Sequence, residues 1–236
     1  MRKSTEDTYN ALTSTYEKSI DHASPYNAFY ERPAMMDEVD QDLSGKKALD
    51  AGCSAGWYSE QLVGRGADVT GVDLSSEMIH AAKRRLGERA SFMQHDLTQS
   101  LPFDENSFDL IISSLTLHYL EDWNPVLEEF DRVLKSGGKL LFSVHHPFMD
   151  FTRFETKDYF KTTLLTETWH KQEITIDVCF YRRALQDVIN SVTNHFCMEE
   201  LIEPQPVKEM KVNNQFAYNY LMTNPHFLLV KSRSQK

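Results

Sequence analysis

Short apolar runs alternate along residues 46–145 with stretches in which apolar positions recur at helical spacing. Apolar runs bounded by turn residues predict buried strands, whereas recurrence every three to four positions predicts helices. The predicted strands lie at 48–50, 67–72, 90–95, 107–113 and 139–144, and the predicted helices at 57–62, 77–86 and 125–134. Strands that alternate with helices in this way indicate an α/β fold, a mostly parallel sheet with helices on both faces.

The rest of the chain, residues 146–236, has a different pattern of apolar and polar residues. The segment 150–171 is rich in aromatic residues and is expected to be a loop that roofs a pocket. The remaining predictions are a half-buried strand at 174–181, a helix at 183–192, and two strands at 197–202 and 227–230. The last two strands are expected to form an antiparallel hairpin that completes a seven-stranded sheet, with a long polar connection between them.

The N-terminal residues carry an aromatic and aliphatic stripe at helical spacing, which predicts a helix over residues 1–20. The stripe comprises Tyr9, Leu12, Tyr16 and Ile20. Further along, Pro33 suits the first turn of a helix at 34–42. Tyr30 and Arg32 beside it are candidates for the mouth of a ligand site, although a surface cation is the favoured interpretation of Arg32.

The chain of 236 residues is long enough to bury a full core, and we expect one domain rather than two. The predicted parts are an N-terminal helical cap at 1–45, a ligand-binding core at 46–145, an inserted lid at 146–172, and the C-terminal part of the sheet at 173–236.

Charge and composition narrow the class of partner. The formal net charge of −10 disfavours a nucleic-acid partner, which needs a basic footprint, and suits a small or cationic ligand. No apolar run approaches the length of a membrane span, and the first residues lack the apolar segment of a signal peptide. We therefore expect a cytoplasmic protein without membrane contact, and both a monomer and a homodimer stay open.

Three cysteines, Cys53, Cys179 and Cys197, are odd in number and lack the spacing of metal ligands. They are interpreted as reduced thiols, which agrees with a cytoplasmic location, and no metal site is predicted.

Polar residues close each of the five predicted parallel strands. They are Asp50, Asp73, Asp96, Ser113 and His145. Because the carboxyl ends of parallel strands meet at one edge of a sheet, these side chains are expected to converge on a ligand there. The small-residue turn from Gly52 to Gly56 brings backbone amides close to that ligand, and Asp73 is placed to accept hydrogen bonds from a ribose diol.

The spacing of the glycines bears on which nucleoside binds. A dinucleotide site has three glycines in the pattern G-x-G-x-x-G, whereas Gly52-Cys-Ser-Ala-Gly56 has two, with Ser54 in the middle place. If that place needs a positive φ, Ser54 is mildly strained. Asp50 would also repel a pyrophosphate but not a cation. An NAD(P)-binding oxidoreductase is thereby disfavoured but stays open as an alternative.

The stretch Leu49-Asp-Ala-Gly-Cys-Ser-Ala-Gly56 resembles the first motif of class I S-adenosylmethionine-dependent methyltransferases, apart from Ser54. The stretches 101–109 and 113–123 resemble those of the menaquinone- and ubiquinone-type members, and the helix with Tyr9 and Tyr16 resembles their N-terminal helix. The resemblance implies a Rossmann-like doubly wound fold and S-adenosylmethionine as cofactor. It implies a cofactor site made of Tyr16, Asp50, Gly52, Cys53, Ser54, Gly56, Asp73, Leu74, Asp96, Leu97, Ser113 and Leu115.

The resemblance further implies in-line transfer of a methyl group to a small-molecule acceptor, with S-adenosylhomocysteine as product. Such a transfer depends chiefly on positioning, and a general base helps when the acceptor is a hydroxyl or an acidic carbon. His145, His146 and His118 are the candidate bases, because histidine titrates near neutral pH. The acceptor, and whether O, N or C is methylated, stay open. So does a non-catalytic protein that binds S-adenosylmethionine.

Overall fold

The computed structural model describes residues 5–16, 24–154, 156–171 and 174–236. Its main sheet has seven strands in the order β3-β2-β1-β4-β5-β9-β8. The strands are β1 (Lys47–Ala51), β2 (Asp68–Asp73), β3 (Ser91–Gln94), β4 (Phe108–Ser114), β5 (Leu134–His145), β8 (Phe196–Ile202) and β9 (Phe227–Ser234). Strands β1 to β5 run parallel, and β9 pairs antiparallel with both β5 and β8. The predicted α/β class and the antiparallel C-terminal pair are confirmed.

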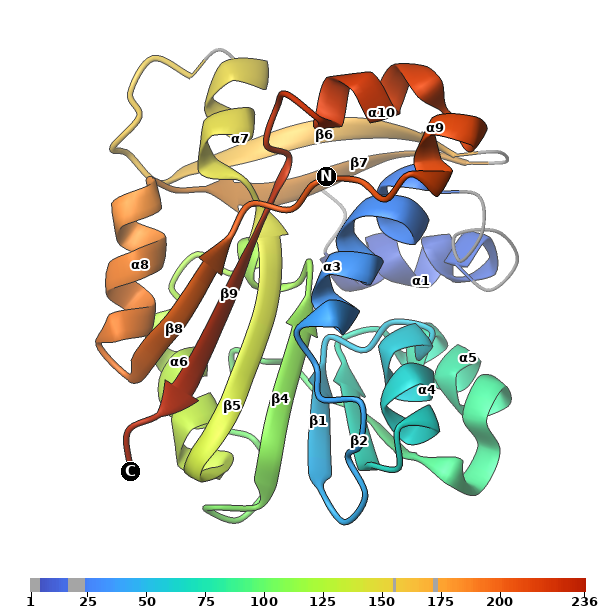
Figure 1. The fold of residues 1–236 in the computed structure, drawn as a ribbon, viewed down its shortest axis with the longest axis vertical. Helices are drawn as coiled ribbons and strands as arrows, with labels where there is room; N and C mark the ends of the chain where they lie inside the picture. The colour runs from blue at the N-terminus through green and yellow to red at the C-terminus, as the bar shows by residue number, and fades with distance from the viewer. Residues whose placement is uncertain (1–4, 17–23, 155, 172–173) are drawn as a thin grey trace.

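Helices cover both faces of this sheet (Figure 1). The helices that follow the parallel strands are α4 (Trp57–Gly64), α5 (Ser76–Leu86) and α6 (Asn124–Val133), and α8 (Leu185–Thr193) precedes β8. Successive side chains of a strand point to opposite faces. Ile111 of β4 therefore packs in one cluster with α6 and α8, whereas Leu110 and Ile112 pack in the other cluster with α4. This alternation gives the doubly wound arrangement.

Local signals account for several helix ends. The Ser75 hydroxyl accepts a hydrogen bond from the Met78 amide at 3.1 Å and caps α5. Pro33 lies in the first turn of α3 (Arg32–Asp37), which is shorter than the predicted helix at 34–42 and continues a π-helix, η2 (Asn27–Glu31). Two 3₁₀ turns, η3 (Gly87–Arg89) and η4 (Leu117–Tyr119), follow α5 and β4.

The N-terminal prediction is confirmed over part of its length. Helix α1 spans Thr5–Thr15, whereas Ile20 and the other residues of 17–23 lie outside the described part of the chain. Leu12 of α1 is fully buried against Met78 and Ala81 of α5 and against strand β7 (Ile174–Arg182). The aromatic stripe therefore docks α1 beside the core.

The segment 150–171 differs from the predicted loop. It contains most of helix α7 (Pro147–Arg153) and all of β6 (Thr163–Lys171), which pairs antiparallel with β7 (Ile174–Arg182) in a separate two-stranded sheet. The polar side chains of β6 hid its strand character, because the strand is stabilised by its partner rather than by its own alternation. In Figure 1 this two-stranded sheet lies across the carboxyl ends of the parallel strands, with α7 beside it, so the predicted roof exists but is built from regular elements.

The long connection before β9 is also more regular than predicted. Helices α9 (Glu209–Asn213) and α10 (Gln215–Leu221) lie within it, and Met210, Ala217 and Leu221 are buried against the sheet. The two C-terminal strands are thus neighbours in the sheet but are joined by a helical excursion rather than by a tight turn.

One buried carboxyl group ties the N-terminal cap to the sheet. Glu31 is fully buried, and its carboxyl accepts hydrogen bonds from Tyr58 Oη at 2.6 Å, Ser114 Oγ at 2.7 Å and Ser143 Oγ at 2.5 Å. Burial raises the pKa of this group. The three donors come from α4, β4 and β5, so Glu31 joins four elements at one point.

We predict that Glu31→Ala lowers the free energy of unfolding by about 3 kcal/mol, because three buried hydroxyl groups lose their acceptor. Urea denaturation of both proteins measures the difference. Glu38→Ala is the matched control. Glu38 pairs with Lys231 at 2.8 Å in a partly exposed ion pair, and its loss should cost less than about 1 kcal/mol. Equal losses in the two variants would contradict this prediction.

Candidate active site

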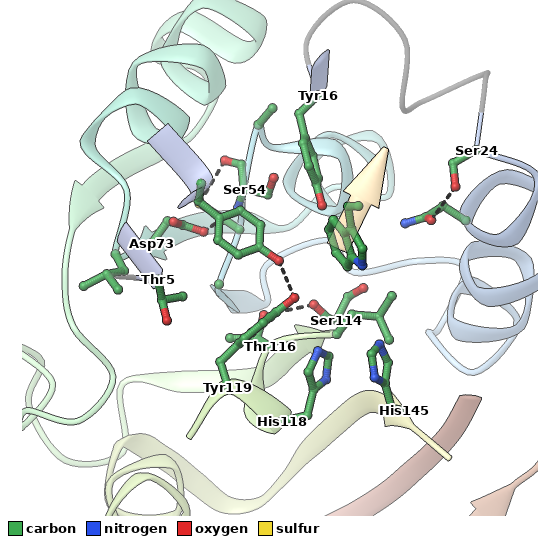
Figure 2. A pocket seen from close by; sticks show the side chains of 18 of the residues that line it. Thr5, Tyr16, Ser24, Ser54, Asp73, Ser114, Thr116, His118, Tyr119 and His145 are labelled. Carbon is green, nitrogen blue, oxygen red and sulfur yellow. Dashed lines mark hydrogen bonds between the residues drawn. The ribbon is translucent and has the colours of Figure 1, made fainter. Parts of the chain in front are cut away.

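A cavity of about 800 Å³ lies at the carboxyl ends of β1, β2, β4 and β5. Its walls come from the turn after β1, from α1, from α7, and from the two-stranded sheet above. Figure 2 shows polar and aromatic side chains that face it, among them those of Ser54 in the turn after β1, Asp73 at the end of β2 and His145 at the end of β5. The predicted convergence of strand ends on one edge therefore coincides with a large cavity, as expected for an open α/β sheet.

The turn after β1 has the backbone of a close-approach loop. Gly52 and Gly56 have φ angles of +83° and +82°, and Ser54 has a φ of +49°. The positive φ expected at Ser54 is thus present in a residue other than glycine. A Cβ on Gly52 would lie 2.2 Å from Thr116 Oγ1, so no other residue fits there without displacing the chain after β4.

Asp73, the last residue of β2, is bonded directly to this turn. Its Oδ2 accepts a hydrogen bond from the Ser54 amide at 2.8 Å, and its Oδ1 accepts one from the Ser75 amide at 2.8 Å. Burial raises its pKa, and the two amides act in the opposite direction. The carboxyl lines the cavity and is held rigidly, with lone pairs left for a ligand.

Asp50 lies behind this surface and does not line the cavity. It is 1% exposed, and Ser59 Oγ donates a hydrogen bond to its Oδ2 at 2.6 Å. Burial raises its pKa to about 7, against the opposing effect of Ser59.

Two other candidates for cofactor contact also lie outside the cavity wall. Ser113 is fully buried and donates from Oγ to the carbonyl of Ala51 at 2.8 Å, which joins β4 to β1. Gly56 caps α4 and packs against Ala82 of α5. In the structure, these two residues stabilise the turn after β1 and its neighbours.

The remaining candidates from the core do line the cavity. They are Gly52, Cys53, Ser54, Asp73, Leu74, Asp96, Leu97 and Leu115. Asp96 Oδ1 also accepts a hydrogen bond from the Thr98 amide at 2.9 Å, in the local turn that such a residue often makes.

The N-terminal cap contributes aromatic side chains and one cation. Tyr9 donates from its hydroxyl to that of Tyr119 at 2.6 Å, and the ring of Tyr16 lies 6.1 Å from that of Tyr9. The Arg32 guanidinium lies 4.2 Å from the centroid of the Trp57 ring. Arg32 is 6% exposed and lines the cavity, so the favoured interpretation of it as a surface cation is wrong.

Sequence reasoning missed Trp57 and Tyr119 as cavity residues. Tyr119 lies in a polar-aromatic stretch after β4 and shows no local motif for a ligand contact. Its hydroxyl partner is 110 positions away, a distance over which neither spacing nor periodicity carries information.

The three candidate histidines have different surroundings. His118 and His145 stack with ring centroids 4.1 Å apart and an angle of 18° between the planes (Figure 2). Both ring nitrogens of His118 are buried without a hydrogen-bond partner among the described residues, and burial holds its pKa well below the usual range. His118 is therefore neutral and offers no accessible nitrogen to the cavity.

His145 differs from its stacking partner. Its Nδ1 is buried, but its side chain keeps 12% of its surface exposed and lines the cavity. Nε2 is therefore the ring nitrogen that can meet a ligand. Asp150 Oδ1 lies 3.5 Å from Nδ1 on the buried side.

His146 does not line the cavity, in contrast to the expectation that placed it among the bases. Its Nδ1 accepts a hydrogen bond from the Phe148 amide at 3.2 Å and caps α7, while Nε2 lies 2.8 Å from Glu203 Oε1. Consecutive residues of an extended backbone point to opposite sides, so His145 and His146 cannot both face the cavity.

Among the described residues, no group of three or more histidine, cysteine, aspartate or glutamate residues could hold a metal ion. Within the same ranges, no helix has the length and apolar character that crossing a membrane requires.

Comparisons with known proteins agree with this geometry. Residues 49–142 match the family model described as a methyltransferase domain. The chain is 30% identical to demethylmenaquinone methyltransferase of Lactococcus lactis subsp. lactis, over 67% of this chain and 66% of that protein. It is 40% identical to malonyl-[acyl-carrier protein] O-methyltransferase of Erwinia billingiae, over 42% of this chain and 39% of that protein. A solved structure from Listeria monocytogenes, assigned to the S-adenosylmethionine-dependent methyltransferases, is 26% identical with a TM-score of 0.75, over 87% of this chain and 97% of that chain.

The chain thus spans about two fifths of the Erwinia relative and about two thirds of the Lactococcus relative. The fold, the family model and the structural relative together define its class. The chain belongs to the class I S-adenosylmethionine-dependent methyltransferases, which are enzymes, and S-adenosylmethionine is its cofactor. This result decides against the NAD(P)-binding alternative.

We predict that the free energy of unfolding falls as the pH rises toward neutrality, and that Asp50→Asn reduces this fall. A carboxyl whose pKa rises from about 4 in the unfolded chain to about 7 on folding binds more protons when folded. Its contribution therefore favours the folded state at low pH and is lost as the pH rises from about 4 to about 7, by up to about 4 kcal/mol. Urea denaturation across this range should show that decline in the natural protein, and a smaller one in Asp50→Asn. Parallel curves for the two proteins would contradict the assignment.

Proposed function

We propose that this chain transfers a methyl group from S-adenosylmethionine to a small-molecule acceptor that lies beside His145, and that His145 is the general base. The proposal rests on one observation. Asp73 and Asp96 on one wall and His145 on another line the same continuous cavity. Its volume of about 800 Å³ is near the upper end of the roughly 300–1,000 Å³ typical of one small ligand, which suits two molecules side by side.

The chemistry of the first wall fits the cofactor. Asp73 is held rigidly and can accept from two ribose hydroxyls, while Asp96 can accept from the exocyclic amine of adenine. The apolar side chains Leu97 and Leu115 supply surfaces for the adenine ring.

The methionine end is assigned to the N-terminal cap. Arg32, buried at the cavity wall and stacked on Trp57, supplies a cation for the methionine carboxylate. Tyr16, whose pKa burial raises to about 12, stays protonated and can donate a hydrogen bond there.

When bound, S-adenosylmethionine supplies a methyl group that the adjacent sulfonium makes electrophilic. The residues of the chain hold the acceptor in line and receive its proton. His145 suits this task because Nε2 faces the cavity, whereas His118 has no accessible nitrogen and His146 lies outside.

Aromatic side chains, and one cation that is paired with a carboxylate, line the acceptor side of the cavity. Its lining residues include Tyr26, Met149, Arg153, Trp169, His226 and Phe227. Arg153 forms an ion pair with Glu167, and burial lowers the pKa of His226 to about 3, so this wall carries little net charge. These surfaces support a compact acceptor with aromatic or apolar character rather than a polyanion.

Two further observations concern the kind of acceptor and the location of the protein in the cell. The two relatives above have names that refer to different acceptors, demethylmenaquinone and malonyl-[acyl-carrier protein]. They support methyl transfer to a metabolic acceptor without selecting one. A cytoplasmic location is part of the proposal, and the free thiols of Cys53, Cys179 and Cys197 support it.

Asp73→Ala is predicted to weaken binding of S-adenosylmethionine by about 1–3 kcal/mol, because a charged hydrogen-bond acceptor for the ribose is lost. Isothermal calorimetry with S-adenosylmethionine, S-adenosylhomocysteine and NADH measures this, and NADH should give no binding heat with either protein. Asp68→Ala, at the opposite and exposed end of the same strand, is the control and should bind normally. Unaltered affinity of Asp73→Ala would contradict the ribose role.

His145→Gln is predicted to lower turnover about 10²- to 10⁴-fold, the contribution of a general base, with the affinity for S-adenosylmethionine nearly unchanged. Transfer of label from methyl-labelled S-adenosylmethionine to a pool of cell metabolites gives the measurement and reveals the acceptor. His80→Gln, exposed on α5, should retain normal turnover. Normal label transfer by His145→Gln would remove His145 from the mechanism.

A further inference from the structure

Beside His145 lies a carboxyl group that sequence analysis did not single out, at the wall of the same cavity. Asp150, in α7, is 2% exposed, and its Oδ1 lies 3.5 Å from Nδ1 of His145. Both atoms are buried, and neither has another hydrogen-bond partner among the described residues. A buried carboxylate oxygen and a buried imidazole nitrogen that face each other in this way each need a partner, and each can be that of the other.

A small pocket of about 10 Å³ lies beside these two atoms. It is lined by Asp150, His145, His118 and Arg183, together with apolar and aromatic side chains. This is close to the room that one water molecule needs, and Arg183 Nε adds another unpartnered polar atom to its wall. Nδ1 of His145 and Oδ1 of Asp150, which are 3.5 Å apart, come within direct hydrogen-bond distance after a small side-chain rotation.

One cation lies close to the pair. The guanidinium of Arg183, which donates to the Leu120 carbonyl at 2.6 Å and stacks on Trp123 at 4.0 Å, is a fixed cation at the same small pocket. Burial lowers the pKa values of the neighbouring imidazoles His118, His146 and His226. Nε2 of His146 is paired with Glu203 at 2.8 Å, so His145 is the imidazole that presents Nδ1 to Asp150.

We infer that Asp150 is a positioning residue that holds the proton of His145 on Nδ1 and so leaves Nε2 free to accept a proton from the methyl acceptor. This inference rests on the proposed function of His145. As the acceptor atom forms its bond to the methyl carbon, the bond from that carbon to sulfur breaks, and the acceptor's proton passes to Nε2. The imidazolium that results has Asp150 on its far side. Oriented imidazoles work in this way in other base-assisted enzymes.

The test reads the tautomer of His145 without need of the acceptor. Long-range proton–nitrogen NMR spectra are recorded on protein labelled with ¹⁵N-histidine and bound to S-adenosylhomocysteine, at a pH where the imidazole is neutral. His145→Gln identifies the signal. We expect the proton on Nδ1 in the natural protein. In Asp150→Asn we expect it on Nε2, because the amide nitrogen can then donate to Nδ1.

Asp177→Asn, on the exposed side of β7, is the matched control and should leave the His145 signal in place. A proton on Nε2 in the natural protein overturns the inference whatever the variants do, and so does an unchanged tautomer in folded Asp150→Asn. Turnover gives an independent readout. Asp150→Asn should lose at least tenfold in the natural background and nothing further in His145→Gln. Normal turnover of His145→Gln would instead contradict the proposed role of His145 as base. The NMR result would still decide whether Asp150 sets the tautomer of His145.

Discussion

The hydrogen bond from the Ser54 amide to Asp73 Oδ2, 2.8 Å long, is the contact on which the site depends. It joins the turn after β1 to the end of β2, and it exists because the two strands pair in parallel register, with Ala51 opposite Val72. A shift of that register by one residue would turn Asp73 to the other face of the sheet. The turn, its left-handed serine and the carboxyl group therefore form one unit, which the sheet holds rigid.

Buried polar contacts also attach the parts that close the cavity. Glu31 ties the N-terminal cap to three elements of the core through three hydroxyl groups, and the Tyr9–Tyr119 hydrogen bond joins α1 to the chain after β4. Such contacts act over short distances and have strict geometry, so they place a wall of a cavity more accurately than apolar packing does. The result is a cavity with one wall made by the sheet and another made by α7, β6 and β9.

Burial controls the chemistry of this cavity more than pairwise charge does. It raises the pKa of Asp50 to about 7 and lowers that of His226 to about 3. The side chains with an accessible nitrogen or oxygen are consequently few, and His145 stands out because its two ring nitrogens have different surroundings, one beside Asp150 and one toward the cavity. That asymmetry is what a base requires.

The sequence alone determined the alternation of strands and helices, the glycine turn and the acid at the end of β2, because each depends on neighbours within a few positions or on a simple period. The tertiary structure decided what spacing does not encode. It buried Asp50 and Ser113 behind the cavity wall, brought Arg32 into that wall, made a strand of the polar segment 163–171, and separated the adjacent His145 and His146. Each of these outcomes depends on partners far away in the chain, and burial and pairing become known only when those partners are in place.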